Sequence, residues 1–171
     1  MIIFKNSRNN KMKKLLVLTA IATAFTGSAM AASVSLSGVV EPVCQISGVD
    51  TVNTFSALAV GHSLQHNITV QCNDSDGAEI TLKSTEGLLE SSDHEDQGIA
   101  YQATFKAGDF DFALIPTNWV NGDNDLTVTG TSPGSVALAQ GVPGTLVLEL
   151  LEEAVFAGTY TDTLQIAITA R

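Results

Sequence analysis

The chain has 171 residues and is acidic, with eight Lys and Arg residues against eighteen Asp and Glu residues. Its formal net charge of −10 argues against binding to nucleic acid and to anionic lipid surfaces, since both are themselves negatively charged.

The first 31 residues have the pattern of an export signal that is cleaved. Basic residues such as Lys13 and Lys14 precede an apolar run over Leu15–Phe25, and Ala29-Met30-Ala31 is a small-x-small cleavage site. An uncleaved membrane anchor is the alternative, but the apolar run is short for a bilayer, which needs about 20 residues. The sequence therefore predicts export, cleavage after residue 31 and no membrane insertion of the mature chain.

Removal of the signal makes the chain more acidic. Five basic residues leave with it, so Lys83, Lys106 and Arg171 remain beside eighteen acidic residues, a formal net charge of −15. The remaining chain of about 140 residues has the length of a single typical domain. We expect an extension over 32–40 and a single domain over 41–171.

The extension alternates between apolar and polar residues. Val34, Leu36, Gly38 and Val40 share one parity, while serines take the positions between Ala32 and Gly38. This period of two predicts a β-strand. We expect it to be the start of a strand over Val34–Ile46.

Cys44 and Cys72 are the two cysteines of the chain. In an exported protein an even cysteine count favours a disulfide, and the spacing suits neither a metal site nor a catalytic thiol pair. The sequence predicts a structural bridge that stabilises the fold by roughly 3.5 kcal/mol through loop closure.

Short alternating segments separated by turn residues continue to the end of the chain, which predicts an all-β sandwich without a helix. Glu86–Gln97 is polar and is predicted to be a loop. Turns are expected at residues 73–77, 106–109, 121–124 and 132–134. The further predicted strands are Leu64–Cys72, Ala78–Ser84, Ile99–Lys106, Phe110–Ile115, Asp125–Gly130, Gly144–Leu151 and Thr159–Ala170.

Residues 130–134 match the G-x-S-x-G pattern of a serine nucleophile elbow. The elbow uses the backbone N–H of the residue after the serine as an oxyanion donor, but here that residue is Pro133, which has none. The pattern therefore favours a turn, and no catalytic residue is predicted.

Three other residue groups were weighed as binding sites. His62 and His66 lie four apart but outside a helical metal-binding pattern, and the acidic pairs at 74–76 and 123–125 do not continue into a calcium loop. Trp119 could stack on a sugar, yet a lone tryptophan is usually part of a core. No metal and no cofactor are predicted.

The closing strand is the second clearly alternating terminus. Tyr160, Leu164, Ile166 and Ile168 share one parity, and polar residues such as Gln165 take the other. A terminal strand can pair with another chain, accept a strand from another chain or stay unpaired, whereas an internal strand is held by its neighbours.

These residues resemble the subunits of chaperone-usher pili, in particular the archaic branch related to spore coat protein U. The resemblance covers nearly the whole mature chain. It rests on the extension before Cys44 and on Phe55–Gly61, which is similar to the family's F-x-x-L-x-x-G segment. It rests also on Ile68–Cys72 and on the G-x-Y-x-D-x-L pattern of Gly158–Leu164.

The resemblance implies an incomplete immunoglobulin-like sandwich, one strand short, with a groove beside its last strand. By position, the face that such a family donates corresponds to Val34, Leu36, Gly38 and Val40. The residues that line or border the acceptor groove correspond to Tyr160, Leu164, Ile166 and Ile168. The implied partners are a periplasmic chaperone, an outer-membrane usher and neighbouring subunits at the surface of a Gram-negative bacterium.

The leading hypothesis is accordingly a non-enzymatic subunit of an adhesive or biofilm pilus, joined to its neighbours by donor-strand exchange. The alternative is a self-contained secreted sandwich that binds a carbohydrate or protein, in which residues 32–40 pair within their own sheet. A secreted hydrolase is a third class and has little support. The first two differ in whether the domain is stable without residues 32–40.

Overall fold

The computed structural model describes residues 33–49, 52–93, 97–116 and 125–171. It divides into two units, Met1–Gly38 and Val39–Arg171. In the first unit the described residues, 33–38, have no regular secondary structure and are exposed. The export signal that the sequence predicts over 1–31 lies outside the described residues. No described helix is long and apolar enough to cross a bilayer.

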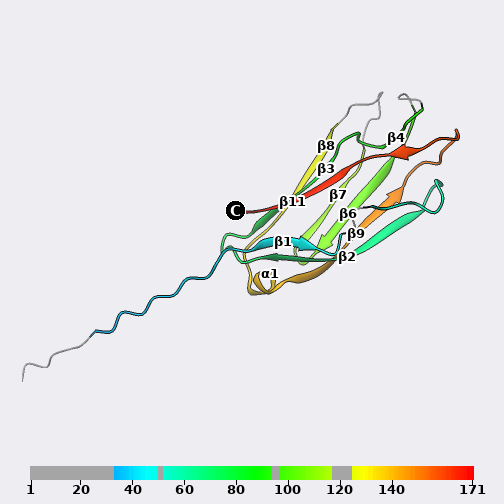
Figure 1. Cartoon of the computed structure of the whole chain (residues 1–171). Helices are drawn as coiled ribbons and strands as arrows, with labels where there is room; N and C mark the ends of the chain where they lie inside the picture. Colours follow the sequence, from blue (N-terminus) through cyan, green and yellow to red (C-terminus); the bar gives the residue numbers. More distant parts are fainter. Residues whose placement is uncertain (1–32, 50–51, 94–96, 117–124) are drawn as a thin grey trace, which may run out of the picture. The chain divides into compact units, whose positions relative to one another are not determined.

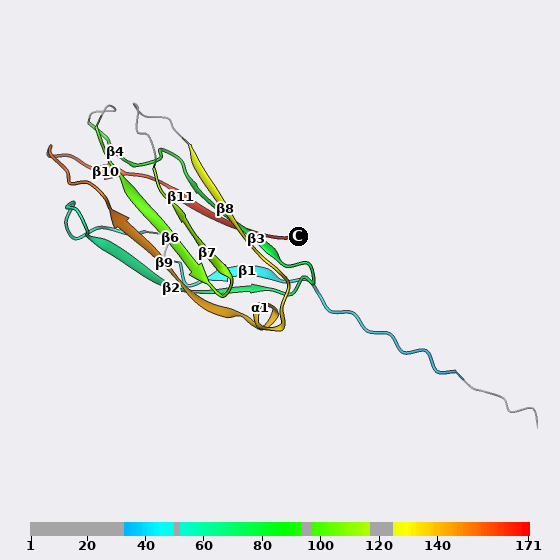
Figure 2. The same cartoon turned by 180° about the vertical axis from the view of Figure 1, so that it is seen from behind.

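The second unit is an all-β sandwich (Figures 1 and 2). In its described part, one sheet has the order β1-β2-β9-β6-β7 and the other has the order β11-β3-β8. A small third sheet has the order β10-β4-β5; along the chain, β4 and β5 fall between β3 and β6, and β10 falls between β9 and β11. The strand pairs among the described residues are all antiparallel.

The first sheet is formed by β1 (Cys44–Ser47), β2 (Ser63–Cys72), β9 (Val142–Leu150), β6 (Tyr101–Ala107) and β7 (Phe110–Leu114). The second sheet is formed by β11 (Leu164–Ala170), β3 (Ala78–Ser84) and β8 (Leu126–Ser132). The small sheet is formed by β10 (Tyr160–Thr161), β4 (Leu89–Ser91) and β5 (Gly98–Ile99).

Alternation along the strands builds the core between the two large sheets. On β3 every second residue from Ala78 to Ser84 is buried, and β6 shows the same pattern from Tyr101 to Ala107. Phe105 is fully buried in this core. The centroid of its ring lies 5.4 Å from that of Phe112 and 6.3 Å from that of Phe110. Such a period-two pattern is what a sheet with one core-facing side requires.

The predicted disulfide is confirmed. Cys44 and Cys72 are bonded, and they are direct partners in the ladder between β1 and β2. The bridge therefore ties the first residue of β1 to the last residue of β2.

Several predicted boundaries were wrong. The strand predicted over Val34–Ile46 forms only at Cys44–Ser47, and residues 33–43 have no regular secondary structure. The strand predicted over Thr159–Ala170 is interrupted at Asp162 and Thr163. The predicted loop over Glu86–Gln97 contains the short strand β4.

A five-residue helix, α1 (Val136–Gln140), was not predicted from the sequence. The side chain of Ser135 caps it by accepting from the backbone N–H of Leu138 at 3.1 Å. It ends at Gly141, whose φ of 102° most side chains avoid. Gln71 of β2 donates to the carbonyl of Ala139 at 2.9 Å and so fastens the helix to the first sheet.

Candidate functional site

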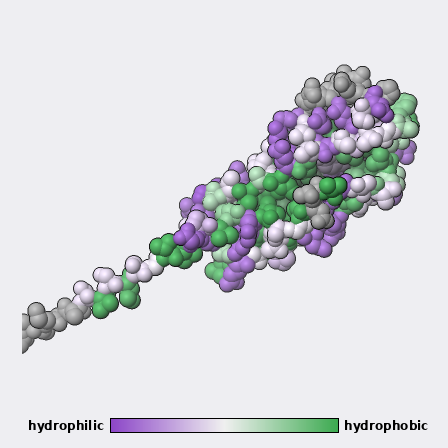
Figure 3. Space-filling view, viewed as in Figure 1, coloured by the Kyte–Doolittle hydropathy of each residue, from purple (hydrophilic) through white to green (hydrophobic). Residues whose placement is uncertain are grey.

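The candidate site is a groove of about 490 Å³ along one side of the sandwich. β1 is the edge strand of its sheet and β11 is the edge strand of the other, and residues of both line the groove. Figure 3 shows apolar residues gathered on the face of the molecule where β1 and β11 lie in Figure 1. Both sheets therefore end beside the groove, each with one strand that has a neighbour on only one side.

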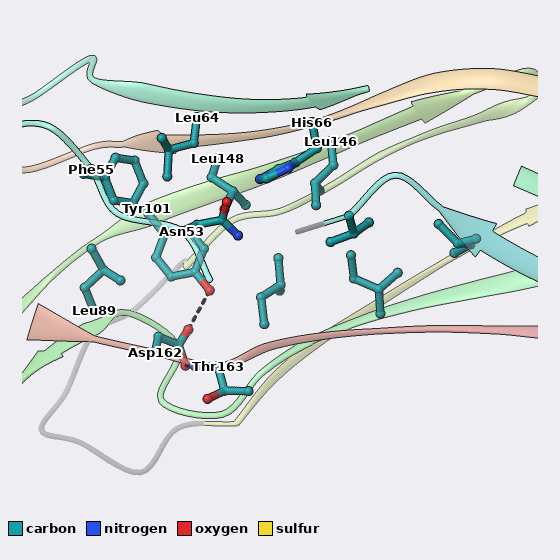
Figure 4. Close-up of a pocket in the computed structure, with 14 residues that line it drawn as sticks. Asn53, Phe55, Leu64, His66, Leu89, Tyr101, Leu146, Leu148, Asp162 and Thr163 are labelled. Carbon is teal, nitrogen blue, oxygen red and sulfur yellow. Dashed lines mark hydrogen bonds between the residues drawn. The ribbon is translucent and has the colours of Figure 1, made fainter. Parts of the chain in front are cut away.

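The floor of the groove comes from the first sheet. Leu64 and His66 of β2 contribute to it together with Leu146 and Leu148 of β9 (Figure 4). Leu146 is buried, and His66 is only 6% exposed. The walls come from Ile46 of β1 and from Leu164 and Ile166 of β11, which are half-buried. The groove is thus mainly aliphatic.

The polar end of the groove is built around the carboxylate of Asp162. Its Oδ2 accepts from the hydroxyl of Tyr101 at 2.5 Å and from that of Ser84 at 2.5 Å. Its Oδ1 accepts from the hydroxyl of Thr85 at 3.0 Å and from the backbone N–H groups of Glu86 at 3.1 Å and Thr163 at 2.6 Å. Because Tyr101 belongs to the first sheet and Ser84 to the second, Asp162 links the two sheets.

Tyr101 stays neutral in this setting. The residue is 3% exposed, and burial raises the pKa of its phenol far above the ordinary value, an effect that the negative charge of Asp162 strengthens. A protonated phenol can donate to the carboxylate of Asp162, in the hydrogen bond drawn in Figure 4.

The predicted acceptor residues divide into two pairs. Leu164 and Ile166 line the groove, whereas Tyr160 and Ile168 are half-buried but are not among its lining residues. Tyr160 belongs to β10 and donates its hydroxyl to the carbonyl of Phe156 at 2.9 Å. Ile168 lies opposite Ile80 in the ladder between β11 and β3.

The predicted donor residues are exposed. Val34 is 81% exposed, Leu36 91% and Val40 83%. Apolar side chains with this exposure repeat along the segment and cost free energy in water. The segment therefore gains stability from any apolar surface that covers it.

Sequence reasoning missed the remaining lining residues. Phe55 and Leu89 close the same end of the groove as Tyr101, and Asn53 lies beside them (Figure 4). Asp162 was noted only as part of the G-x-Y-x-D-x-L pattern. That pattern was the available signal, but it does not name the hydroxyl donors.

Of the other residues that the sequence offered as candidates for a site, only His66 lines the groove among those that the structure describes. His62 is exposed, and Ser132 is 3% exposed with its hydroxyl donated to the carbonyl of Pro133 at 3.2 Å. Asp74 accepts from the backbone of Asp76 at 2.8 Å, as a turn residue does. Trp119 and Asp123 lie outside the described residues. The described residues contain no cluster of three or more metal-ligating side chains.

No protein-family model matches this sequence, and no curated protein matches it.

Proposed function

We propose that the protein is a structural subunit of a bacterial surface pilus, in which the groove of one copy receives residues 32–40 of its neighbour. The observation that carries the proposal is the apolar groove between the two sheet edges, together with an exposed alternating segment in the same chain. An inserted strand can pair its backbone with an edge strand and place alternate side chains in the groove.

The energetics favour such an exchange. Val34, Leu36 and Val40 are nearly fully exposed, and burial of each contributes about 1.5–3 kcal/mol before entropy costs. Leu164 and Ile166 lose their remaining contact with water at the same time. Main-chain hydrogen bonds to an open edge add to this gain. A joint of this kind holds without a covalent bond.

The route to the surface follows from the same proposal. The signal over 1–31 directs export to the periplasm, where a chaperone covers the groove until an outer-membrane usher joins the subunits. An open edge with exposed apolar side chains aggregates if nothing covers it, which is the physical need for the chaperone. The assembled pilus then serves adhesion or biofilm formation. No enzymatic activity is part of this proposal.

The test compares a chain that begins at Glu41 with and without a synthetic peptide of residues 32–40. At a peptide concentration of 100 Kd the gain of about 2.7 kcal/mol raises the thermal midpoint by roughly 10 °C. A peptide with Leu36→Asp is expected to fail, because it places a charge on the apolar face. A peptide with Ser35→Asp carries the same charge on the other face and is expected to bind.

Three results would contradict the proposal. The shortened domain could be as stable as the full mature chain and ignore the peptide, which would favour a self-contained binding module. The two charged peptides could bind equally well, which would show that the alternation has no role. The peptide could also bind a variant with Ile166→Asp as well as it binds the unaltered domain, which would place its site outside the groove.

A further inference from the structure

The three residues between the extension and β1 are held by one side chain. Asn73 donates its Nδ2 to the carbonyl of Glu41 at 2.8 Å, and its Oδ1 accepts from the backbone N–H of Val43 at 2.8 Å. The backbone N–H of Asn73 also donates to the carbonyl of Val43 at 3.0 Å. These contacts lie directly beside the disulfide, because Val43 precedes Cys44 and Asn73 follows Cys72.

Pro42 lies between Glu41 and Val43, the two residues that the side chain of Asn73 bonds. Its ring fixes its own φ near −65° and drives the preceding residue, Glu41, towards extended backbone. Pro42 has no N–H to bond, so the side chain of Asn73 engages the groups on either side of it. The backbone of Glu41–Val43 is therefore restrained at each of its three residues.

This restraint decides where the extension can go. β1 leads from Cys44 to Ile46, which lines the groove, so the chain before Cys44 starts from the opposite end of the strand. For residues 34–40 to enter the groove of their own chain, the backbone must reverse between Val40 and Cys44. Tight reversals between neighbouring antiparallel strands favour positive φ, which Pro42 cannot adopt. The reversal would also break the bonds from Asn73.

We propose that Asn73 is a positioning residue that keeps Glu41–Val43 extended, so that residues 32–40 are presented to a second copy of this chain and not to their own groove. The inference rests on the proposed function and assigns to Asn73 the choice between exchange and self-insertion. Pro42 assists it, and the disulfide holds the base of the segment.

The experiment uses the full chain after removal of the signal, with Asn73→Ala as the variant and Asp74→Ala as the matched control. Asp74 is the next residue and bonds within its own turn, to the backbone of Asp76. Size-exclusion chromatography with light scattering gives the monomer fraction at several concentrations. A labelled peptide of residues 32–40 then reports whether the groove of the monomer is open or filled.

Asn73→Ala is expected to raise the fraction of monomer that refuses the peptide by about tenfold, the effect of one or two net hydrogen bonds on an equilibrium. Asp74→Ala is expected to behave as the unaltered chain. Pro42→Gly keeps Asn73 and the disulfide but frees the backbone, so it is also expected to raise the fraction of monomer that refuses the peptide. It decides the question if Asn73→Ala does not fold.

If the fraction of monomer that refuses the peptide is unchanged in both Asn73→Ala and Pro42→Gly, in a chain that does form oligomers, the role of Asn73 is overturned and the proposed function stands. An unaltered chain that neither forms oligomers nor, when shortened to begin at Glu41, binds the peptide rejects the proposed function and this inference with it. Failure of the inference is thus seen in the two variants, whereas failure of the proposed function is seen in the unaltered chain and its shortened form.

Discussion

β3 and β11 are neighbours in one sheet and have the same alternation, yet they differ in burial. Ile80 and Leu82 of β3 are 0% exposed, whereas their ladder partners on β11, Ile168 and Ile166, are half-buried. β3 lies between two strands and β11 has a neighbour on one side only. The same type of residue is therefore a completed core position on one strand and an uncovered one on the next.

The largest expected effect tests this difference in burial. Leu82→Ala is expected to lower the free energy of unfolding by about 2–5 kcal/mol, because it leaves a cavity in a packed core. Ile166→Ala, at the paired position, is expected to cost about 1 kcal/mol, since the side chain is already partly in water. Urea unfolding of the shortened domain measures both values.

Saturating peptide of residues 32–40 sharpens the same comparison. It is expected to raise the cost of Ile166→Ala towards that of Leu82→Ala, because the inserted strand completes the core around Ile166. Equal costs at the two positions without peptide would mean that β11 is already covered, and the comparison would fail.

The second effect concerns the point where β11 begins beside the end of β3. Asp162→Ala is expected to lower the free energy of unfolding by about 2–4 kcal/mol, because the buried hydroxyls of Ser84 and Tyr101 lose their acceptor. Asp125→Ala is the matched control. Its carboxylate forms an exposed ion pair with Lys83 at 2.5 Å, and such pairs contribute at most about 1 kcal/mol. Similar losses in both variants would mean that Asp162 does not join the sheets.

The smallest effect is a dependence on pH through Tyr101. Its pKa is raised in the folded state by burial first and by the charge of Asp162 second. Below pH about 10 both states keep the phenol proton, so Tyr101 contributes no slope. Above pH about 10 only the unfolded state releases it, and stability falls by up to about 1.4 kcal/mol per pH unit.

Chemical unfolding between pH 9 and pH 11.5, compared with Tyr101→Phe, measures this slope. The variant is expected to lose stability less steeply above pH about 10, because phenylalanine has no proton to release. Identical slopes in the two proteins would show that folding does not raise the pKa of Tyr101.

The parts of the fold that follow from local pattern were predictable from the sequence. Alternation located β2, β3 and β7 to within one residue, and the cysteine count together with the predicted export signal predicted the disulfide. Alternation predicted a strand over residues 34–43 that does not form. The pattern shows which side chains are apolar, but it does not show whether a partner strand is present.

The candidate site was only half predictable for a related reason. Leu164 and Ile166 were found from parity along one strand. The Asp162 cluster joins residues 61 to 78 positions apart, and Asn73 meets Val43 across 30 positions. Polar contacts at such separations arise from the three-dimensional arrangement and leave no periodic trace in a single sequence. Phe55 and Leu89 were missed likewise, because they lie in a loop and a very short strand.

The disulfide also determines how the domain bears mechanical load. β1 has only four residues and sits at a sheet edge, so a pull on the extension would peel it from β2 one hydrogen bond after another. Cys44 is the first residue of β1, and its bond to Cys72 passes the tension directly to β2 before any ladder bond is stressed. β2 pairs with β9 as well as with β1, so the tension passes to a strand that is hydrogen-bonded on both sides.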